Sequence, residues 1–270
     1  MLLFSIMGAL VKLMTAHYAV TQVAFCRSFF ALLAILPLFL AQGAKLGQSG
    51  WWLGHALRGA IGIAGMLTVY LSYARLPLAD AVALTFTVPL WVTAFAGPLL
   101  GERADARAWG AVVVGFAGVL VIFPPTGTAD WLSVAFGLLG NGLIALQITL
   151  IRRLGRTDST TRIVFYYTMA LAAGTAVLAP IDWRTPSLDH AGILVAIGVL
   201  GGVAHLCMTQ AYRVAPAASV APFDYTGLLW SVLFGLLLWG EQPSANLAAG
   251  AAIIIASGIY VLQRSRRRPA

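Results

Sequence analysis

Charged residues are scarce in this sequence. Only 10% of its 270 residues are charged, while 60% are hydrophobic; soluble domains run at about 25% charged and about 45–50% apolar. This shortage excludes a soluble globular domain and places the chain in a lipid bilayer. The net charge of +8 does not indicate nucleic acid, because the basic residues stand in short segments between apolar runs and form no solvated stripe. Anionic lipid headgroups are the expected partner of those charges.

Cysteine and histidine are also few. The two cysteines, Cys26 and Cys207, lie inside apolar runs without metal-ligand or disulfide spacing, so we interpret them as packing residues. Four histidines are scattered through the chain, and the sequence contains no HExxH, P-loop or GxSxG motif. No metal and no cofactor are therefore expected. A membrane-embedded enzyme, the alternative from another class, would need clustered His, Asp, Glu or Ser at the membrane surface.

What the sequence does contain is one stretch that occurs twice. The segment from Tyr73 to Glu102 matches the segment from Tyr212 to Glu241 without a gap, at a separation of 139 residues (212 − 73 = 139). The identical positions include Pro77/Pro216, Thr87/Thr226, Trp91/Trp230 and Gly101/Gly240. Self-similarity at half the chain length indicates a duplicated unit, and two such halves in a membrane protein are a transporter signature. An ion channel, a further alternative, would instead predict symmetric pore assembly and filter-like loops.

Apolar runs of about 20 residues predict membrane-spanning helices. On that rule the fold class is an all-α integral membrane protein with ten transmembrane helices, arranged as two five-helix repeats. The predicted spans are 1–16, 19–41, 51–74, 77–100, 108–124, 131–151, 163–180, 188–211, 217–239 and 246–262. The repeats then cover residues 1–124 and 131–262, and a basic tail covers 263–270. The first span is short and has no basic segment before it, so it is a poor signal peptide; either a few N-terminal residues are missing or this helix is stubby.

Basic residues set the orientation of the spans. With the N-terminus in the cytoplasm, the outer loops contain only Arg75 and Arg184. The inner loops and the tail then hold Lys45, Arg58, Arg103, Arg107, Arg152, Arg153, Arg156, Arg162, Arg213, Arg264, Arg266, Arg267 and Arg268. This asymmetry follows the positive-inside rule and predicts a multi-pass protein of the inner membrane with both termini cytoplasmic. Because each repeat has five spans, an odd number, the two repeats must be inverted.

Glycine and proline mark special points of the predicted helices. Glycines cluster in the third, sixth and eighth spans, where small faces favour close helix packing: Gly59, Gly62, Gly65, Gly137, Gly140, Gly198, Gly201 and Gly202. Pro89 in the fourth span and Pro222 in the ninth each remove a backbone hydrogen bond and bend the axis. Either bend could lie beside a cavity, or could simply be tolerated by neighbouring helices.

Four ionisable residues within the predicted spans stand out as candidates: Lys12, Arg27, His205 and Asp224. Such groups cost roughly 2.5–3.5 kcal/mol on insertion scales and mark a pathway. Arg27 could bind a substrate carboxylate or phosphate through its planar fork, or cross-link helix ends through backbone carbonyls. Lys12 could attract the same anion or extend to the outer headgroups. Asp224 needs a partner, either His205 or a substrate cation, and His205 is either a proton carrier or a hydrogen-bonded interior residue.

Several aromatic residues could stack on a flat ligand. Tyr167 and Tyr225 are the candidates we keep for the substrate site, beside Tyr166, Tyr70, Trp91 and Trp230. Each of these side chains could instead be bulk that faces lipid or an interfacial belt residue. Glu102 and Glu241 stand at helix ends near water, where a capping or loop-ordering role is expected.

Together these residues resemble the EamA-type transporters of the drug/metabolite transporter superfamily over nearly the whole chain. The resemblance rests on Lys12, on Arg27 within QVAFCRSFFAL, on LPLADAVALTFTVPLW followed by LLGE, and on APFDYTGLLWSVLFGLLLWGE. It implies a ten-helix inverted repeat, a central cavity lined mainly by helices one to four and six to nine, and alternating access for small metabolites. The PFDY stretch over 222–225 resembles a subgroup described as importers of riboflavin or S-adenosylmethionine. The position equivalent to Arg27 is Tyr167 (167 − 27 = 140), so any site is asymmetric.

The sequence therefore predicts a secondary transporter of a small organic metabolite, such as an amino-acid-like, nucleoside-like, flavin or S-adenosylmethionine-like solute. Arg27 and Lys12 would attract an anionic group of this solute. Asp224, with or without His205, would take a proton or a cationic group and so couple transport to the proton gradient. Both a monomer and a homodimer are compatible with the sequence, because the glycine-rich fifth and tenth spans suit dimer contacts and internal packing equally.

Overall fold

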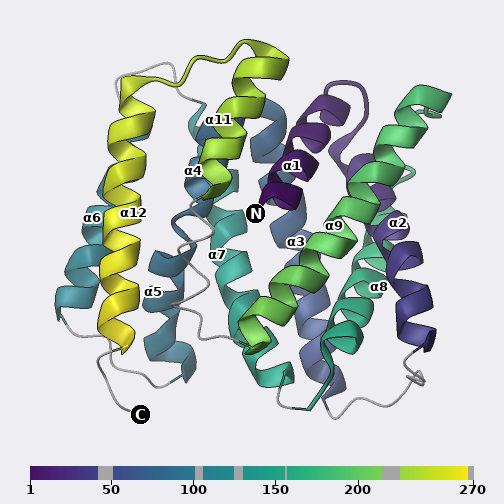
Figure 1. Ribbon diagram of the computed structural model, residues 1–270, viewed down its shortest axis with the longest axis horizontal. Coiled ribbons are helices and arrows are strands. Elements are labelled where there is room, and N and C mark those ends of the chain that lie inside the picture. The colour runs from purple at the N-terminus through teal and green to yellow at the C-terminus, as the bar shows by residue number, and fades with distance from the viewer. Residues whose placement is uncertain (42–50, 101–105, 125–129, 156, 215–225, 267–270) are drawn as a thin grey trace.

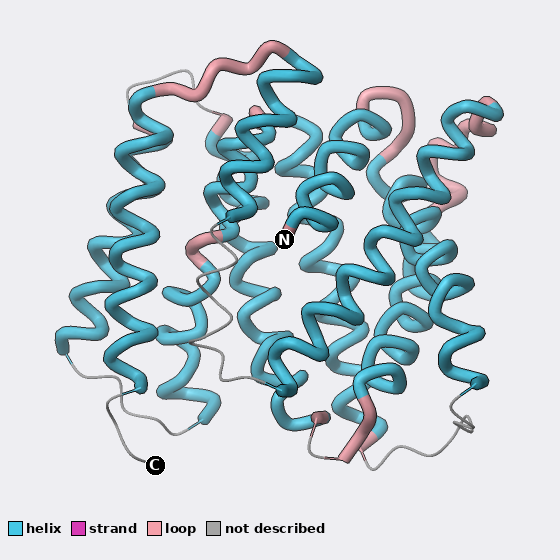
Figure 2. Tube along the Cα trace, viewed as in Figure 1, coloured by secondary structure: helices cyan, strands magenta, loops and turns pink. Residues whose placement is uncertain are grey.

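The computed structural model describes residues 1–41, 51–100, 106–124, 130–155, 157–214 and 226–266, and over these residues the regular structure is helical throughout, with no strand (Figures 1 and 2). The first half contains α1 (Leu2–Thr15), α2 (Val20–Ala41), α3 (Trp52–Arg75), α4 (Leu78–Thr85), α5 (Val88–Leu100) and α6 (Ala106–Ile122). The second half contains α7 (Trp131–Leu154), α8 (Thr160–Leu178), α9 (Leu188–Val214), α11 (Thr226–Trp239) and α12 (Ala245–Arg266).

The helices are apolar enough for a bilayer. Among the described residues, six helical segments are long and apolar enough to cross a membrane, and four shorter apolar helices accompany them. These segments fall on the ten predicted ranges, although part of the range 217–239 lies outside the described residues. Large apolar side chains such as Val113, Val177, Leu229 and Leu237 are exposed, which suits contact with lipid. The prediction of an all-helical membrane protein is confirmed; α12 continues to Arg266, so the first residues of the expected tail are helical.

The predicted fourth span is not one continuous helix. The chain leaves helical geometry at Phe86 and Thr87, so that α4 ends at Thr85 and α5 begins at Val88. Pro89 has no N–H to bond the carbonyl four residues earlier, and a break is the expected result. At the break, the N–H and the Oγ1 hydroxyl of Thr87 both donate to the Leu84 carbonyl, at 3.1 and 2.7 Å. Pro222, the proline of the ninth predicted span, lies outside the described residues.

Most of the glycines noted in the sequence lie at contacts between helices. A Cβ on Gly59 of α3 would stand 2.5 Å from Ala170 Cβ of α8, and one on Gly140 of α7 would stand 2.6 Å from Val69 of α3. Gly198 of α9 approaches the backbone of α2 in the same way. These separations are too short for any side chain, so glycine lets the helix axes come close, as membrane helix pairs require.

Helix neighbours are exchanged between the halves when α7, α8, α9 and α12 are matched in order with α1, α2, α3 and α6. The contact of α3 with α7 corresponds to the contact of α9 with α1, and α2 with α9 corresponds to α8 with α3. The pairs α2 with α8 and α6 with α12 correspond to themselves. In Figure 1, α6 rises towards the upper end of the molecule while α12 descends beside it. We call upper the end where α1 ends and α9 begins, and lower the end where α3 and α8 begin (Figure 1).

Candidate functional site

Arg27 of α2 is a predicted site residue whose side chain lies inside the helix bundle. It is the eighth residue of its helix, about 10 Å from the upper end at 1.5 Å per residue, and its side chain is buried. Its Nη1 lies 3.5 Å from the thioether sulfur of Met66, and its Nε has no hydrogen-bond partner. The ion pairs of the described residues do not include it. Arg27 therefore carries a buried charge that no carboxylate of the described chain balances.

Glycine on the neighbouring helix makes room for this guanidinium. A Cβ on Gly201 of α9 would stand 3.1 Å from Arg27 Nε and 2.9 Å from the sulfur of Met7. Any larger residue at this position would push Arg27 aside. The glycines of α9 thus make room for Arg27 as well as for close helix packing.

Arg58 is a second buried guanidinium, and the sequence analysis assigned it wrongly to an inner loop. It lies within α3 and is 1% exposed. Its Nη1 donates to the Ile163 carbonyl of α8 at 2.9 Å, its guanidinium carbon lies 3.9 Å from the centre of the Tyr167 ring, and its Nε has no hydrogen-bond partner. The signal was present, because Arg58 stood inside the predicted span 51–74 and should have been treated like Arg27.

Tyr167 and His205 join Arg58 in one cluster. The Tyr167 and His205 rings are 5.4 Å apart, and the edge of Phe4 contacts His205 at 5.2 Å. Tyr167 also fills the space over Gly62, where a Cβ would stand 2.4 Å from the ring. Because Arg58, His205 and Gly62 already cover this ring, Tyr167 positions Arg58 rather than offering a free stacking surface.

We call Arg27, Arg58, Tyr167 and His205 the central cluster. His205 lies one helical turn after Gly201, so α9 brings the Arg27 contact and the Arg58–Tyr167–His205 contacts onto neighbouring turns. His205 Nδ1 and the Tyr70 hydroxyl are buried and have no hydrogen-bond partner among the described residues. The predicted partners Asp224 and Tyr225 lie outside the described residues. In chemical terms the cluster can bind an anion, since two desolvated guanidinium groups have donor atoms to spare.

Lys12 does not belong to the central cluster. Its Nζ donates to the Leu76 carbonyl at 2.7 Å and forms an ion pair with Glu241, above the ring of Trp239. Glu241 in turn accepts the Leu78 N–H at 2.8 Å and so caps the start of α4. The Lys12 ammonium is thus paired within the protein at the upper end. It does not extend to lipid headgroups and is not a free site for an anion. The expected capping role of Glu241 agrees with these contacts.

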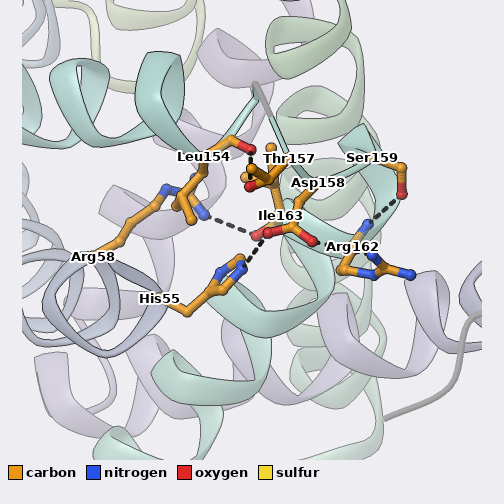
Figure 3. A network of polar contacts seen from close by, with 8 residues as sticks. All are labelled: His55, Arg58, Leu154, Thr157, Asp158, Ser159, Arg162 and Ile163. Carbon is orange, nitrogen blue, oxygen red and sulfur yellow. Dashed lines mark hydrogen bonds and ion pairs between the residues drawn. The ribbon is translucent and has the colours of Figure 1, made fainter. Parts of the chain in front are cut away.

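A polar network at the lower end was not predicted. Asp158, in the connection between α7 and α8, accepts hydrogen bonds from His55 of α3 and Arg162 of α8 at 3.2 and 3.1 Å (Figure 3). Pairing of this kind depends on which helix faces meet, and the sequence does not give that. The described residues hold no group of three or more His, Cys, Asp or Glu that could bind a metal ion.

Apolar helices surround two buried guanidinium groups, and neither forms an ion pair among the described residues; ionisable groups inside a membrane mark a functional site. A family model described as the EamA-like transporter family matches residues 1–123 and again residues 131–263. The chain belongs to this family, as the resemblance of its motifs indicated. It is a small-molecule secondary transporter, and its family and relatives are transporters rather than enzymes.

Named relatives cover almost the whole chain. The pseudopaline exporter CntI of Pseudomonas aeruginosa is 31% identical over 98% of this chain and 93% of its own length. A riboflavin transporter of Vibrio cholerae is 31% identical over 98% and 92% of the two chains, and an S-adenosylmethionine uptake transporter of Rickettsia bellii is 23% identical over 91% and 84%. A solved crystal structure shares the fold with a TM-score of 0.68 at 18% identity, over 98% of this chain and 96% of that chain.

Proposed function

We propose that this transporter moves a small organic solute with a carboxylate or phosphate group across the inner membrane by alternating access between two inverted five-helix halves, residues 1–124 and 131–262. Three observations support the two halves: the exchange of helix neighbours, the opposite directions of α6 and α12, and the double match to one family model. The distribution of basic residues favours ten crossings with both termini in the cytoplasm.

The observation that carries the solute class is the buried charge of Arg27, which forms no ion pair with any carboxylate among the described residues. A buried guanidinium without a carboxylate partner is costly, and membrane proteins keep such groups where they meet a substrate or an ion. Arg58 adds a second positive charge in the same cluster, held in place by Ile163 and Tyr167. We leave Lys12 out of the proposed solute site because its ammonium is already paired with Glu241. Asp224 and Tyr225 stay predicted site residues, with Asp224 and His205 as the proposed proton or cation acceptor.

The solute can be identified by ligand-induced stabilisation of the purified protein. Amino acids and S-adenosylmethionine carry a carboxylate and form the first panel. Nucleosides and riboflavin, which carry neither a carboxylate nor a phosphate, form the comparison panel; relatives are named for riboflavin and S-adenosylmethionine. A true ligand raises the melting temperature by mass action. The same solute is then followed in vesicles for uptake and efflux, since one relative is named an exporter and another an uptake transporter.

Substitution of Arg27 tests the anion site. Arg27→Ala should weaken solute binding by about tenfold to a hundredfold, as expected for loss of a hydrogen-bonded charge, and Arg27→Lys should restore part of it. Arg75→Ala is the matched control, because Arg75 is exposed at the end of α3. If Arg27→Ala and Asp224→Asn both transport at the wild-type rate while the proteins accumulate normally, the site assignment is wrong.

A further inference from the structure

At the upper end, the connection between α1 and α2 is tied to the start of α9. The Tyr18 hydroxyl and His190 Nδ1 are 2.8 Å apart, and the two rings meet nearly at right angles with centres 5.5 Å apart. The His17 ring lies 4.9 Å from His190 and completes the contact. This tie joins the first half of the chain to the second.

At the lower end, the connection between α7 and α8 is tied to the start of α3. Asp158 Oδ2 is 3.2 Å from His55 Nε2, and Asp158 Oδ1 is 3.1 Å from Arg162 Nη1. The Asp158 side chain is fully buried, and Figure 3 shows it between His55 on one side and Arg162 on the other. This tie joins the second half of the chain to the first.

The two ties occupy the same place in the repeat. Tyr18 stands two residues before α2 begins at Val20, and Asp158 stands two residues before α8 begins at Thr160. Their separation (158 − 18 = 140) equals that of Arg27 and Tyr167, the equivalent positions named in the sequence analysis. Their partners lie on matched helices, because His190 is in the first turn of α9 and His55 is in the first turn of α3, although the two histidines are not themselves equivalent positions (190 − 55 = 135). In each half, the connection before the second long helix (α2 or α8) contacts a helix of the other half. The two contacts lie at opposite ends of the molecule (Figure 1).

We infer that these ties are two gates that open in turn. We name Tyr18 with His190 the upper latch, and His55 with Asp158 and Arg162 the lower latch. The inference rests on the proposed alternating access: a solute at the central cluster needs a path to one end, and each latch holds a connection of one half against a helix of the other half at that end. Release of the upper latch favours the conformation open at the upper end, and release of the lower latch favours the opposite one.

Two equivalent buried positions provide matched reporters. Val23 of α2 lies near the upper latch and Ile163 of α8 near the lower latch, they are 140 residues apart (163 − 23 = 140), and both are at most 1% exposed. Each is replaced by cysteine in a Cys26→Ala/Cys207→Ser background. The rate of labelling by a polar maleimide is measured on the full chain in lipid nanodiscs without solute. The probe thus reads opening directly, whichever solute is transported.

The latch variants should act in opposite directions. Tyr18→Phe should raise labelling at the upper reporter about threefold, as for loss of one neutral hydrogen bond, and should not raise it at the lower reporter. Asp158→Asn should raise labelling at the lower reporter on the order of tenfold and should not raise it at the upper one. A rise at both reporters in either variant, or at neither reporter in both variants, would overturn the inference.

Failure of Asp158→Asn to fold does not remove the test. The double variant Asp158→Asn/Arg162→Gln opens the lower latch without leaving an unpaired charge, and the same rise at the lower reporter is expected from it. Failure of the solute assignment is separate as well. If Arg27→Ala transports normally while the two reporters respond oppositely, the solute site is wrong and the latches stand.

Discussion

The upper and lower latches stand at equivalent places of a duplicated fold and differ in chemistry. The lower latch is a buried carboxylate between an imidazole and a guanidinium, with the Asp158 side chain at 0% exposure. The upper latch is a hydrogen bond between a phenol and an imidazole, without a carboxylate, and His190 is only half-buried. The duplication kept the position of the contact while the residues that make it diverged. A duplicated chain therefore predicts where a contact lies more reliably than which residues make it.

The difference also predicts unequal strength. A carboxylate taken out of water depends on its partners, because an unpaired buried charge costs several kcal/mol. A neutral hydrogen bond contributes about 0.5–1.5 kcal/mol net. The upper end has an ion pair of its own, Lys12 with Glu241, but these side chains are 13% and 21% exposed. Solvent screens such a pair, so its contribution is expected to fall between those of the two latches.

The largest effect should come from Asp158→Ala. This change leaves the buried imidazole of His55 without its acceptor and removes the counter-charge of Arg162, so we expect a loss of about 3–5 kcal/mol in the free energy of unfolding. Denaturant titration in detergent, followed by tryptophan fluorescence, measures it. Asp189→Ala is the control, because Asp189 is exposed in the first turn of α9; it should stay within about 0.5 kcal/mol. Equal losses in the two variants would show that burial does not distinguish the lower latch.

The Lys12–Glu241 pair should rank second. A double-mutant cycle of Lys12→Met and Glu241→Gln isolates the energy of the pair from the other contacts of each residue. We expect a coupling of about 1 kcal/mol, since the pair is partly exposed and Lys12 also donates to the Leu76 carbonyl. The cycle is read from unfolding midpoints in the same detergent. A coupling energy larger than the loss in unfolding free energy measured for Asp158→Ala would reverse the order proposed for the two ends.

Tyr18→Phe should have a smaller effect on stability. It removes one hydroxyl and keeps the ring that packs against His190, so about 0.5–1 kcal/mol should be lost. Tyr260→Phe is the matched control, because Tyr260 is exposed on α12 and its hydroxyl can bond water; no loss is expected. The comparison would fail if both phenylalanine variants unfolded at the same midpoint.

The sequence was sufficient for the all-helical membrane class because composition is a property of the chain itself. Apolar runs locate helices in any bilayer, and the match of Trp91 with Trp230 needs no coordinates. The break between α4 and α5 was only half foreseen: Pro89 predicted a bend, but the shift of the Thr87 bonds to Leu84 depends on local geometry.

The site was harder to predict because it depends on helix faces. Arg27 was found, since a guanidinium deep in an apolar run is rare and marks a functional position. Arg58 was counted with the loops although it is buried under Tyr167. His55 and Asp158 were missed because their pairing joins residues 103 apart in the chain. Lys12 was identified as buried charge, but its partner Glu241 lies in the other half, and a single sequence does not say which ends meet.

The smallest effect should come from Asp130, a carboxylate that precedes α7 much as Asp158 precedes α8, but on the surface. Asp130 accepts hydrogen bonds from the Ser133 hydroxyl and N–H, and these bonds lower the pKa of its carboxyl group. A lowered pKa in the folded state gives stability that is present above the ordinary aspartate pKa, about 3.9, and is lost as the pH falls through the lowered value. The melting temperature of Asp130→Asn should therefore lie slightly below that of the wild type at neutral pH and converge with it in acid. The melting temperature of Asp158→Asn should lie much further below that of the wild type at neutral pH, because the Asp158 carboxylate also neutralises Arg162. A difference no larger than that of Asp130→Asn would show that burial gives Asp158 no greater effect on stability than the exposed Asp130 has.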